Sequence, residues 1–275
     1  MIFFYNNIFK VLFIIFILIS TANASITTVS DFREIKNYMG RLDRSSLVIF
    51  DVDCVLIIPS DNDTLSRSPY RKKLWRSVES RISKERSRFL ISIIIMETNW
   101  ILLDKSVIDI INYLTQQKIP TIALTSINTG RFGVIESMED LRIKQLKSVG
   151  IDFTKLAPMK DTIKLDSLRT VHGTPMLNKG IIFTAELDKG MVLKDILQKL
   201  NYYPKKIIFI DDKIQNLYSV QNVCNMLKIP FQGFHYTAIK YLPIPNINQK
   251  LERLRFKILE NEHRWVQYCT IENNY

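Results

Sequence analysis

The chain has 275 residues, with 38 Lys and Arg against 27 Asp and Glu and a formal net charge of +11. This length allows one sizeable hydrophobic core, alone or with a small accessory module. Three cysteines are too few for a fold that depends on a disulfide framework. The positive charge favours anionic partners, but without a basic-aromatic repeat it gives no specific nucleic-acid signature.

The first 24 residues have the pattern of a secretory signal peptide. Lys10 precedes an apolar run over 11–19, and Ala22-Asn23-Ala24 forms an A-x-A-like cleavage site. That run is shorter than the roughly 20 apolar residues that span a bilayer, although an uncleaved membrane anchor is the alternative. We therefore expect residues 25–275 to be exported, to the periplasm or beyond, with no stable membrane span after cleavage.

The next segments predict the start of a core and then a helical cap. A short helix at 31–39 is expected to lead into a buried strand at 46–50. Residues 67–88 read as polar and helical, with nine Lys or Arg against two Glu, and the apolar segment 89–103 could pack them onto the core. These features predict a helical cap over about 60–103 that attracts anions, the alternative being a solvated helix face.

Helical and strand patterns then alternate, which is typical of a parallel α/β sheet. The expected elements are helices at 105–117, 135–148, 193–200, 214–227 and 247–266, with strands at 121–124, 206–210 and 229–234. Residues 160–185 interrupt this order with alternating polarity and a break at His172-Gly173-Thr174-Pro175. They are predicted to form an inserted β-hairpin.

Two acidic pairs follow buried-strand patterns. Asp51 and Asp53 come after the run VIF, and Asp211 and Asp212 come after KIIFI. In open α/β sheets, chemistry gathers at the carboxyl ends of such strands. Four carboxylates there would repel one another unless a divalent cation lies between them, and oxygen ligands suit Mg²⁺. The pattern therefore predicts a magnesium-dependent enzyme that acts on a phosphate.

In chain order, four segments resemble the motifs of the haloacid dehalogenase (HAD) superfamily. They are the D-x-D of VIFDVDCVL, a strand ending in Thr125 (or Ser126), a lysine at a helix start and the acid pair in IIFIDDKIQNL. Lys189 fits the lysine position, and Lys194 is the alternative. The stretches GIIFT, DKG and GFHYT also resemble an exported bacterial family of HAD-like proteins of unknown function. The resemblance implies a Rossmann-like parallel sheet flanked by helices.

The same resemblance implies the roles of the site residues. Asp51 would attack phosphorus to form an aspartyl-phosphate, and Asp53 would act as general acid and base. Thr125, or Ser126, would hydrogen-bond the transferring phosphoryl group. Lys189 would offset the negative charge.

A Mg²⁺ site is implied as well. Asp51 and Asp211 would bind the ion with the backbone carbonyl of Asp53, and Asp212 would support it directly or through water. An acid at position 53 is typical of HAD phosphatases and phosphomutases, and export disfavours a mutase. The expected activity is phosphomonoester hydrolysis, on a phosphorylated small molecule or on a phosphoprotein.

Two other functions remain open on the sequence. One is a secreted interaction protein that keeps the HAD scaffold with little or no turnover. The other is a D-x-D glycosyltransferase, which would leave Asp211 and Asp212 without a role.

The sequence assigns no catalytic or metal-binding role to the cysteine and histidine residues. Cys54 holds a position that many relatives fill with a small residue, so it is either a packing residue or an oxidation-sensitive thiol beside the nucleophile. His172, His235 and His263 show no zinc-like spacing and are expected to be structural.

Overall fold

The strand that carries the first acidic pair lies in the middle of the protein's main sheet. The computed structural model describes residues 25–60, 68–159, 161–243, 247–267 and 270–271. The expected signal peptide at 1–24 and Cys269 lie outside these residues. Within them, every helix is too short or too polar to cross a membrane.

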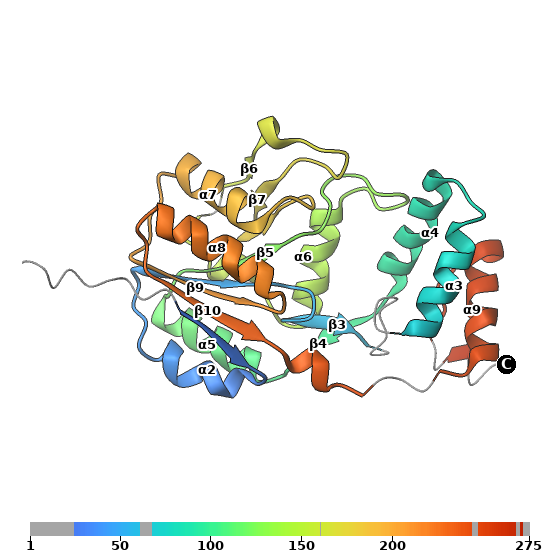
Figure 1. Ribbon diagram of the computed structural model, residues 1–275, viewed down its shortest axis with the longest axis horizontal. Helices are drawn as coiled ribbons and strands as arrows, with labels where there is room; N and C mark the ends of the chain where they lie inside the picture. Colours follow the sequence, from blue (N-terminus) through green and yellow to red (C-terminus); the bar gives the residue numbers. More distant parts are fainter. Residues whose placement is uncertain (1–24, 61–67, 160, 244–246, 268–269, 272–275) are drawn as a thin grey trace, which may run out of the picture.

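The main sheet has eight strands and is mostly parallel (Figure 1). From edge to edge, its strands are β1 (Ser25–Val29), β10 (Phe231–Tyr236), β9 (Lys206–Asp211), β2 (Ser46–Phe50), β5 (Thr121–Thr125), β8 (Ile181–Phe183), β7 (Met176–Asn178) and β6 (Ile163–Lys164). The first six strands in this order, β1, β10, β9, β2, β5 and β8, pair in parallel with their neighbours. The last two, β7 and β6, pair antiparallel and form one edge of the sheet. The α/β class predicted from the sequence is confirmed.

Helices cover both faces of this sheet (Figure 1). One layer contains α2 (Phe32–Met39), α5 (Val107–Gln117) and α6 (Met138–Ser148), and the other contains α7 (Lys189–Lys199) and α8 (Ile214–Met226). Alternate residues of β2 serve the two layers: Val48 and Phe50 pack on the first, Leu47 and Ile49 on the second. Burial on both faces explains why the central strands are continuous apolar runs.

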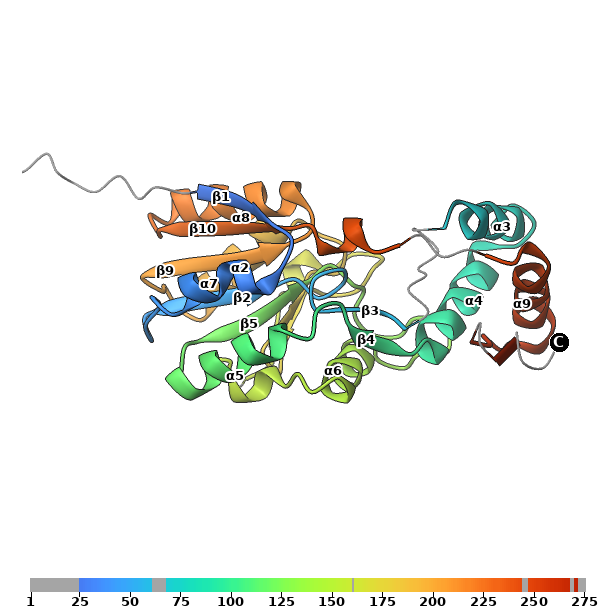
Figure 2. The same cartoon turned by 90° about the horizontal axis from the view of Figure 1, so that it is seen from below.

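A separate helical module lies at one end of the sheet (Figure 2). It contains α3 (Pro69–Glu79), α4 (Lys84–Glu97) and the last helix, α9 (Gln249–Glu262). A short antiparallel pair, β3 (Ile57–Pro59) and β4 (Trp100–Leu102), connects it to the core. The single-turn helices η1 (Phe153–Lys155), η2 (Asp166–Leu168) and η3 (Ala238–Tyr241) lie in loops.

The cap differs from its prediction in two ways. The helical stretch at 67–88 divides into two helices, because Ser68 and Ser83 each accept a backbone N–H as N-caps. In addition, α9 packs against α3 and completes the module's apolar cluster with Phe256 and Leu259. The cap therefore combines an internal segment with the C-terminal helix.

The region predicted to form an inserted β-hairpin, residues 160–185, also differs from its prediction. Its turn is at Lys179–Gly180, both with positive φ, and the break at 172–175 lies in the loop before β7. Strand β8 is a parallel member of the main sheet beside β5, so only β6 and β7 form the added edge. Edge strand β1 was not predicted, because its sequence SITTV is short and largely polar.

A buried ion pair joins the two parts of the cap. Arg71 of α3 donates from Nε to Glu252 Oε1 of α9 at 2.6 Å, and from Nη2 to Oε2 at 3.1 Å. Arg255 Nη1 lies 3.9 Å from the same carboxylate, and all three side chains are nearly inaccessible to solvent.

We expect Glu252→Gln to lower the free energy of unfolding by about 3–5 kcal/mol, because it leaves two buried guanidinium groups without their carboxylate. Urea denaturation followed by fluorescence measures this, since Trp75 and Trp265 lie in the cap cluster. The control is Glu260→Gln, which breaks a largely exposed pair with Arg81 and should cost less than about 1 kcal/mol. Equal small losses in both variants would contradict the expectation.

Candidate functional site

The register of the sheet brings the two acidic pairs together. Phe50 of β2 pairs with Ile210 of β9, so the residues that follow them are neighbours. The Asp51 N–H donates to the Ile210 carbonyl at 2.9 Å, which extends the ladder by one bond. Asp51 and Asp211 therefore lie side by side, both buried, at the carboxyl edge of the sheet.

A buried lysine lies between these two carboxylates. Lys189 Nζ is 2.6 Å from Asp51 Oδ1 and 2.7 Å from Asp211 Oδ2, and its side chain is 2% exposed. Lys194, the alternative from the sequence, is 30% exposed and pairs with Asp195 at 3.6 Å. Of the two lysines, only Lys189 reaches the acidic pairs.

The start of α7 explains how Lys189 is held there. Asp188 is the N-cap, and its side chain accepts from the Met191 N–H at 2.8 Å and from the Ser219 hydroxyl at 2.6 Å. Gly190 allows α7 to approach α8 closely, because a Cβ at this position would lie 2.4 Å from Ser219 Oγ. The DKG sequence thus sets both the start of the helix and its packing.

Three carboxylates form a cluster that fits a hard cation. Asp51, Asp211 and Asp212 each place a carboxylate oxygen within 4.8 Å of the others. Asp212 Oδ1 is buried and has no hydrogen-bond partner among the described residues. An oxygen-only donor set with an unsatisfied buried oxygen is the chemistry expected for Mg²⁺.

The pKa values of the three clustered carboxyl groups are raised, mainly by burial and further by the negative charge of their neighbours. Burial raises the pKa of Asp51 to about 7; the charge of Lys189 opposes this shift and that of Asp211 adds to it. Burial, reinforced by Asp51, raises the pKa of Asp212 to about 6, and burial also raises that of Asp211. Burial acts to lower the pKa of Lys189, but Asp51 and Asp211 outweigh it, and the lysine stays charged.

Asn216 is a site residue that the sequence analysis did not identify. Its side-chain amide donates to both oxygens of Asp211 at 3.0 Å, and the Lys213 N–H donates to Asp211 Oδ1 at 2.7 Å. These bonds orient the carboxylate while Lys189 neutralises it. The only signal in the sequence was the spacing of Asn216 from Asp211, on the first turn of the helix after the strand.

Asp53 faces a different partner from the other acids. Its carboxylate accepts from Arg142 Nη2 at 3.0–3.1 Å, and its side chain is 38% exposed. Arg142 is a buried residue of α6 whose guanidinium lies 4.8 Å from the centre of the Trp100 ring. Nothing in the local sequence marked Arg142, because its role depends on α6 packing against the cap connection.

The cavity beside Asp51 also contains the predicted hydroxyl residues. It measures about 220 Å³ and is lined by Asp51, Asp53, Cys54, Thr125, Ser126, Ile127, Glu186, Lys189, Asp212 and Lys213. Thr125 Oγ1 is buried without a hydrogen-bond partner among the described residues. Ser126 is partly exposed, and its carbonyl accepts from the Glu186 N–H at 2.9 Å. Both residues line the cavity, and the Thr125 hydroxyl is the buried one of the two.

The surroundings of Cys54 disfavour reactivity. Burial, with the charges of Asp212 and Asp53, raises the pKa of its thiol to about 12, so the reactive thiolate is scarce near neutral pH. Its φ of 64° lies in the left-handed region, which glycine adopts without strain. A small residue at this position is therefore a consequence of the sharp turn after Asp53.

Comparison with known proteins places the chain among proteins without an assigned activity. Residues 28–269 match a family described as "Protein of unknown function (DUF2608)". A "Putative outer membrane protein" of Chlamydia trachomatis is 26% identical over 92% of this chain and 95% of that protein. Its counterpart of the same name in Chlamydia muridarum is 35% identical, over 43% of this chain and 48% of that protein. An uncharacterized protein of Rickettsia prowazekii is 24% identical, over 85% and 84%.

Two solved structures are weakly similar. One is a haloacid dehalogenase-like family hydrolase from Streptococcus pneumoniae, with a TM-score of 0.38, 14% identity and coverage of 68% of this chain and 92% of that one. The other is a HAD-superfamily hydrolase of subfamily IA from Geobacter sulfurreducens, with a TM-score of 0.34, 10% identity and coverage of 70% and 93%. TM-scores this low give no basis for assigning an activity.

In metal-free protein at pH 7.5, we expect Asp212→Asn to raise the thermal midpoint by about 2–6 °C. The pKa of Asp212 in the folded state, about 6, lies above its ordinary 3.8, so its charge destabilises the fold as pH rises through this window. The gain should shrink toward pH 4, well below the folded-state pKa, because the carboxyl is then protonated in the folded protein and no longer carries the buried charge.

Thermal unfolding in a chelator at both pH values measures this effect. The control is Asp195→Asn, which removes a carboxylate that pairs with Lys194 outside the cluster and should give no gain. A midpoint for Asp212→Asn that is unchanged or lower at pH 7.5 would contradict the expectation.

Proposed function

The chain belongs to the family described as "Protein of unknown function (DUF2608)", and we propose that it is an exported, Mg²⁺-dependent phosphomonoesterase with an aspartyl-phosphate intermediate. One observation carries the proposal: a buried carboxylate, a buried lysine and an unsatisfied buried hydroxyl meet at one cavity, in Asp51, Lys189 and Thr125. This set offers a nucleophile, a counter-charge and a hydrogen-bond donor for one phosphoryl group.

In the first step, a carboxylate oxygen of Asp51 attacks phosphorus and the bond from phosphorus to the ester oxygen breaks. Asp53, at the half-exposed edge of the same cavity, carries a proton in this step and gives it to the departing oxygen, which returns its carboxyl to the ionised form that pairs with Arg142. In the second step, Asp53 takes a proton from water, the water oxygen attacks phosphorus, and inorganic phosphate leaves Asp51. Lys189 and the Thr125 hydroxyl stabilise the phosphoryl oxygens throughout.

The metal would be held by the carboxylates of Asp51, Asp211 and Asp212, with the Asp53 backbone carbonyl. When bound, Mg²⁺ supplies positive charge that offsets the phosphate and the crowded carboxylates. Asn216 and Lys189 orient Asp211 whether or not the ion is present.

Arg142 is proposed to position Asp53. Its Nη2 holds the Asp53 carboxylate away from the cluster of three acids, and stacking on Trp100 fixes the guanidinium. The general acid is thus kept from competing with Asp51 for the metal.

Export is proposed from the first 24 residues, which carry the signal-peptide pattern. The names of the two Chlamydia relatives, which place those proteins in an outer membrane, agree with a protein that leaves the cytoplasm.

We expect the protein to hydrolyse p-nitrophenyl phosphate only when Mg²⁺ is present, and Asp51→Asn to lower the rate at least about a thousandfold, because the nucleophile is lost. Release of nitrophenol measures the rate. Asp109→Asn, which changes an exposed acid on α5, serves as the control and should keep full activity. A folded wild-type protein that binds Mg²⁺ but hydrolyses no phosphate ester would favour the interaction-protein alternative.

The acid role of Asp53 predicts a dependence on the leaving group. Asp53→Asn should slow hydrolysis of an alkyl phosphate by about 10²–10⁴-fold, because the alkoxide needs a proton to leave. Nitrophenolate leaves without that proton, so the loss with p-nitrophenyl phosphate should be much smaller. The comparison uses kcat/KM on the two esters, which reports the steps up to departure of the alcohol and leaves out the water attack that both esters share. An equal loss of kcat/KM on both would rule out the proposed acid role.

A further inference from the structure

A second, larger pocket opens next to the cavity of the proposed active site. It measures about 360 Å³, within the range of small-molecule sites. The loop after β5 separates the two: Ile127 lines the first cavity and Asn128 the second. Asn128 is only three positions after Thr125, so their Cα atoms are at most about 11 Å apart.

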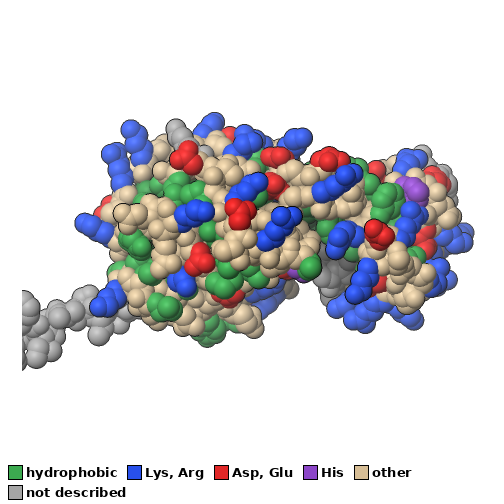
Figure 3. Space-filling model, turned by 90° about the horizontal axis from the view of Figure 1, so that it is seen from above, with side chains coloured by type: hydrophobic (Ala, Val, Ile, Leu, Met, Phe, Trp, Pro, Cys, Tyr) green, Lys and Arg blue, Asp and Glu red, His purple; other side chains and the backbone are tan. Residues whose placement is uncertain are grey.

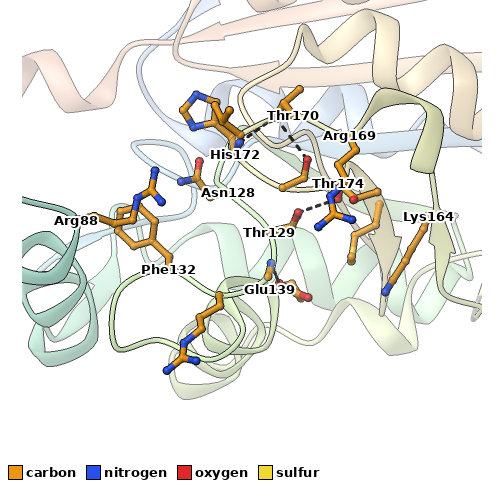
Figure 4. Close-up of a pocket in the computed structure, with 15 residues that line it drawn as sticks. Arg88, Asn128, Thr129, Phe132, Glu139, Lys164, Arg169, Thr170, His172 and Thr174 are labelled. Atoms are coloured by element: carbon orange, nitrogen blue, oxygen red, sulfur yellow. Dashed lines mark hydrogen bonds between the residues drawn. The ribbon is translucent and has the colours of Figure 1, made fainter. Parts of the chain in front are cut away.

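Three cations line this pocket, and none of them pairs with a carboxylate of the described residues. Arg88 enters from the α4 side, and Lys164 and Arg169 lie on the opposite side, with Asn128 and Thr129 between (Figure 4). All three cations are exposed, and among the described residues none forms an ion pair.

The other charged groups of the pocket are engaged elsewhere. Glu139, its one acid, accepts from the Gly130 N–H at 2.7 Å, and Arg131 lies 3.4 Å from Glu136. Lys and Arg side chains are also numerous on the cap that borders this region (Figure 3). The pocket therefore carries an unbalanced positive charge.

The wall of the pocket is built by a close contact between two loops. The Thr129 N–H donates to the His172 carbonyl at 3.0 Å, and Thr129 Oγ1 donates to the Thr174 carbonyl at 2.8 Å. Gly173 has a φ of +113°, and a Cβ there would lie 2.2 Å from Thr129 Oγ1. The position thus requires glycine, and the 170–174 turn, which directly follows Arg169, is held against the loop after β5.

A second close contact brings in the cap. The Val134 N–H donates to Ser92 Oγ of α4 at 3.0 Å, and a Cβ at Gly133 would lie 2.1 Å from the same oxygen. Arg88 is one helical turn before Ser92, on the same face of α4, and its guanidinium lies 5.8 Å from the centre of the Phe132 ring. Docking of the cap therefore places Arg88 at the pocket.

We propose that this pocket binds a second phosphate group of the substrate. The substrates are then small molecules with two phosphates, one held at Asp51 and the other among Arg88, Lys164 and Arg169. Two guanidinium groups and an ammonium group suit a phosphate dianion, which the fork of Arg binds through paired N–H groups. The inference rests on the proposed function for its first phosphate and on the second pocket for its second.

The test is equilibrium binding to the Asp51→Asn protein, in which turnover is blocked. Isothermal titration compares hexanediol bisphosphate with hexyl phosphate, which share one carbon chain. The bisphosphate should bind at least about tenfold more tightly, because charge-assisted hydrogen bonds to its second phosphate are added. Adding Lys164→Gln and Arg169→Gln should abolish this preference and change hexyl phosphate affinity less than about twofold.

A control for loss of surface charge is Lys155→Gln, which removes one exposed charge near the amino end of β5, the end away from the pocket, and should keep the preference. This position is in η1, whose next residue, Leu156, accepts from the Thr121 N–H at the start of β5. Equal affinity for the two probes, or a preference that survives loss of Lys164 and Arg169, would overturn the inference.

The two proposals fail in different ways. If the bisphosphate preference is found and lost as expected while the wild-type protein hydrolyses neither ester, the second site is supported and the phosphatase proposal fails. If the wild-type protein hydrolyses aryl phosphate but shows no bisphosphate preference, the phosphatase proposal holds and this inference is overturned.

Discussion

The ammonium group of Lys189 between Asp51 and Asp211 is the interaction on which the site depends. Three carboxylates gather at the carboxyl edge of the sheet, where the dielectric is low and their repulsion is large. One buried cation, 2.6 Å and 2.7 Å from two of them, makes the arrangement tolerable. This placement of Lys189 between the two carboxylates requires β2 and β9 to be neighbours in register and α7 to begin at residue 189.

The site keeps features that an optimally stable protein would avoid. Asp212 has a buried oxygen without a partner, the Thr125 hydroxyl is unsatisfied, and Cys54 has a positive φ. Unsatisfied groups and strained backbone cluster where a protein uses them. All three lie around one cavity of about 220 Å³, which is the pattern expected of a site prepared for a charged ligand.

The cap is tied to the core by contacts between segments far apart in the chain. Ser92 receives the loop after β5, the short β3–β4 pair connects the two parts, and Glu252 joins α9 to α3. Because the C-terminal helix α9 completes the cap, the stability of the cap affects the position of Arg88 on α4. Cap stability and the shape of the larger pocket are thereby coupled.

Local patterns in the sequence determined the class of fold and the acids of the site. Apolar runs followed by Asp51 and by Asp211 marked two central strands, because a strand buried on both faces must be apolar along its length. Tertiary structure alone decided that Lys189 rather than Lys194 reaches these acids, that Arg142 holds Asp53, and that α9 belongs to the cap. Those outcomes depend on which elements pack together, and a partner many residues away leaves no periodic trace in the local sequence. The polar edge strand β1 could not be recognised for a related reason: it buries little, so hydrophobic patterning does not mark it.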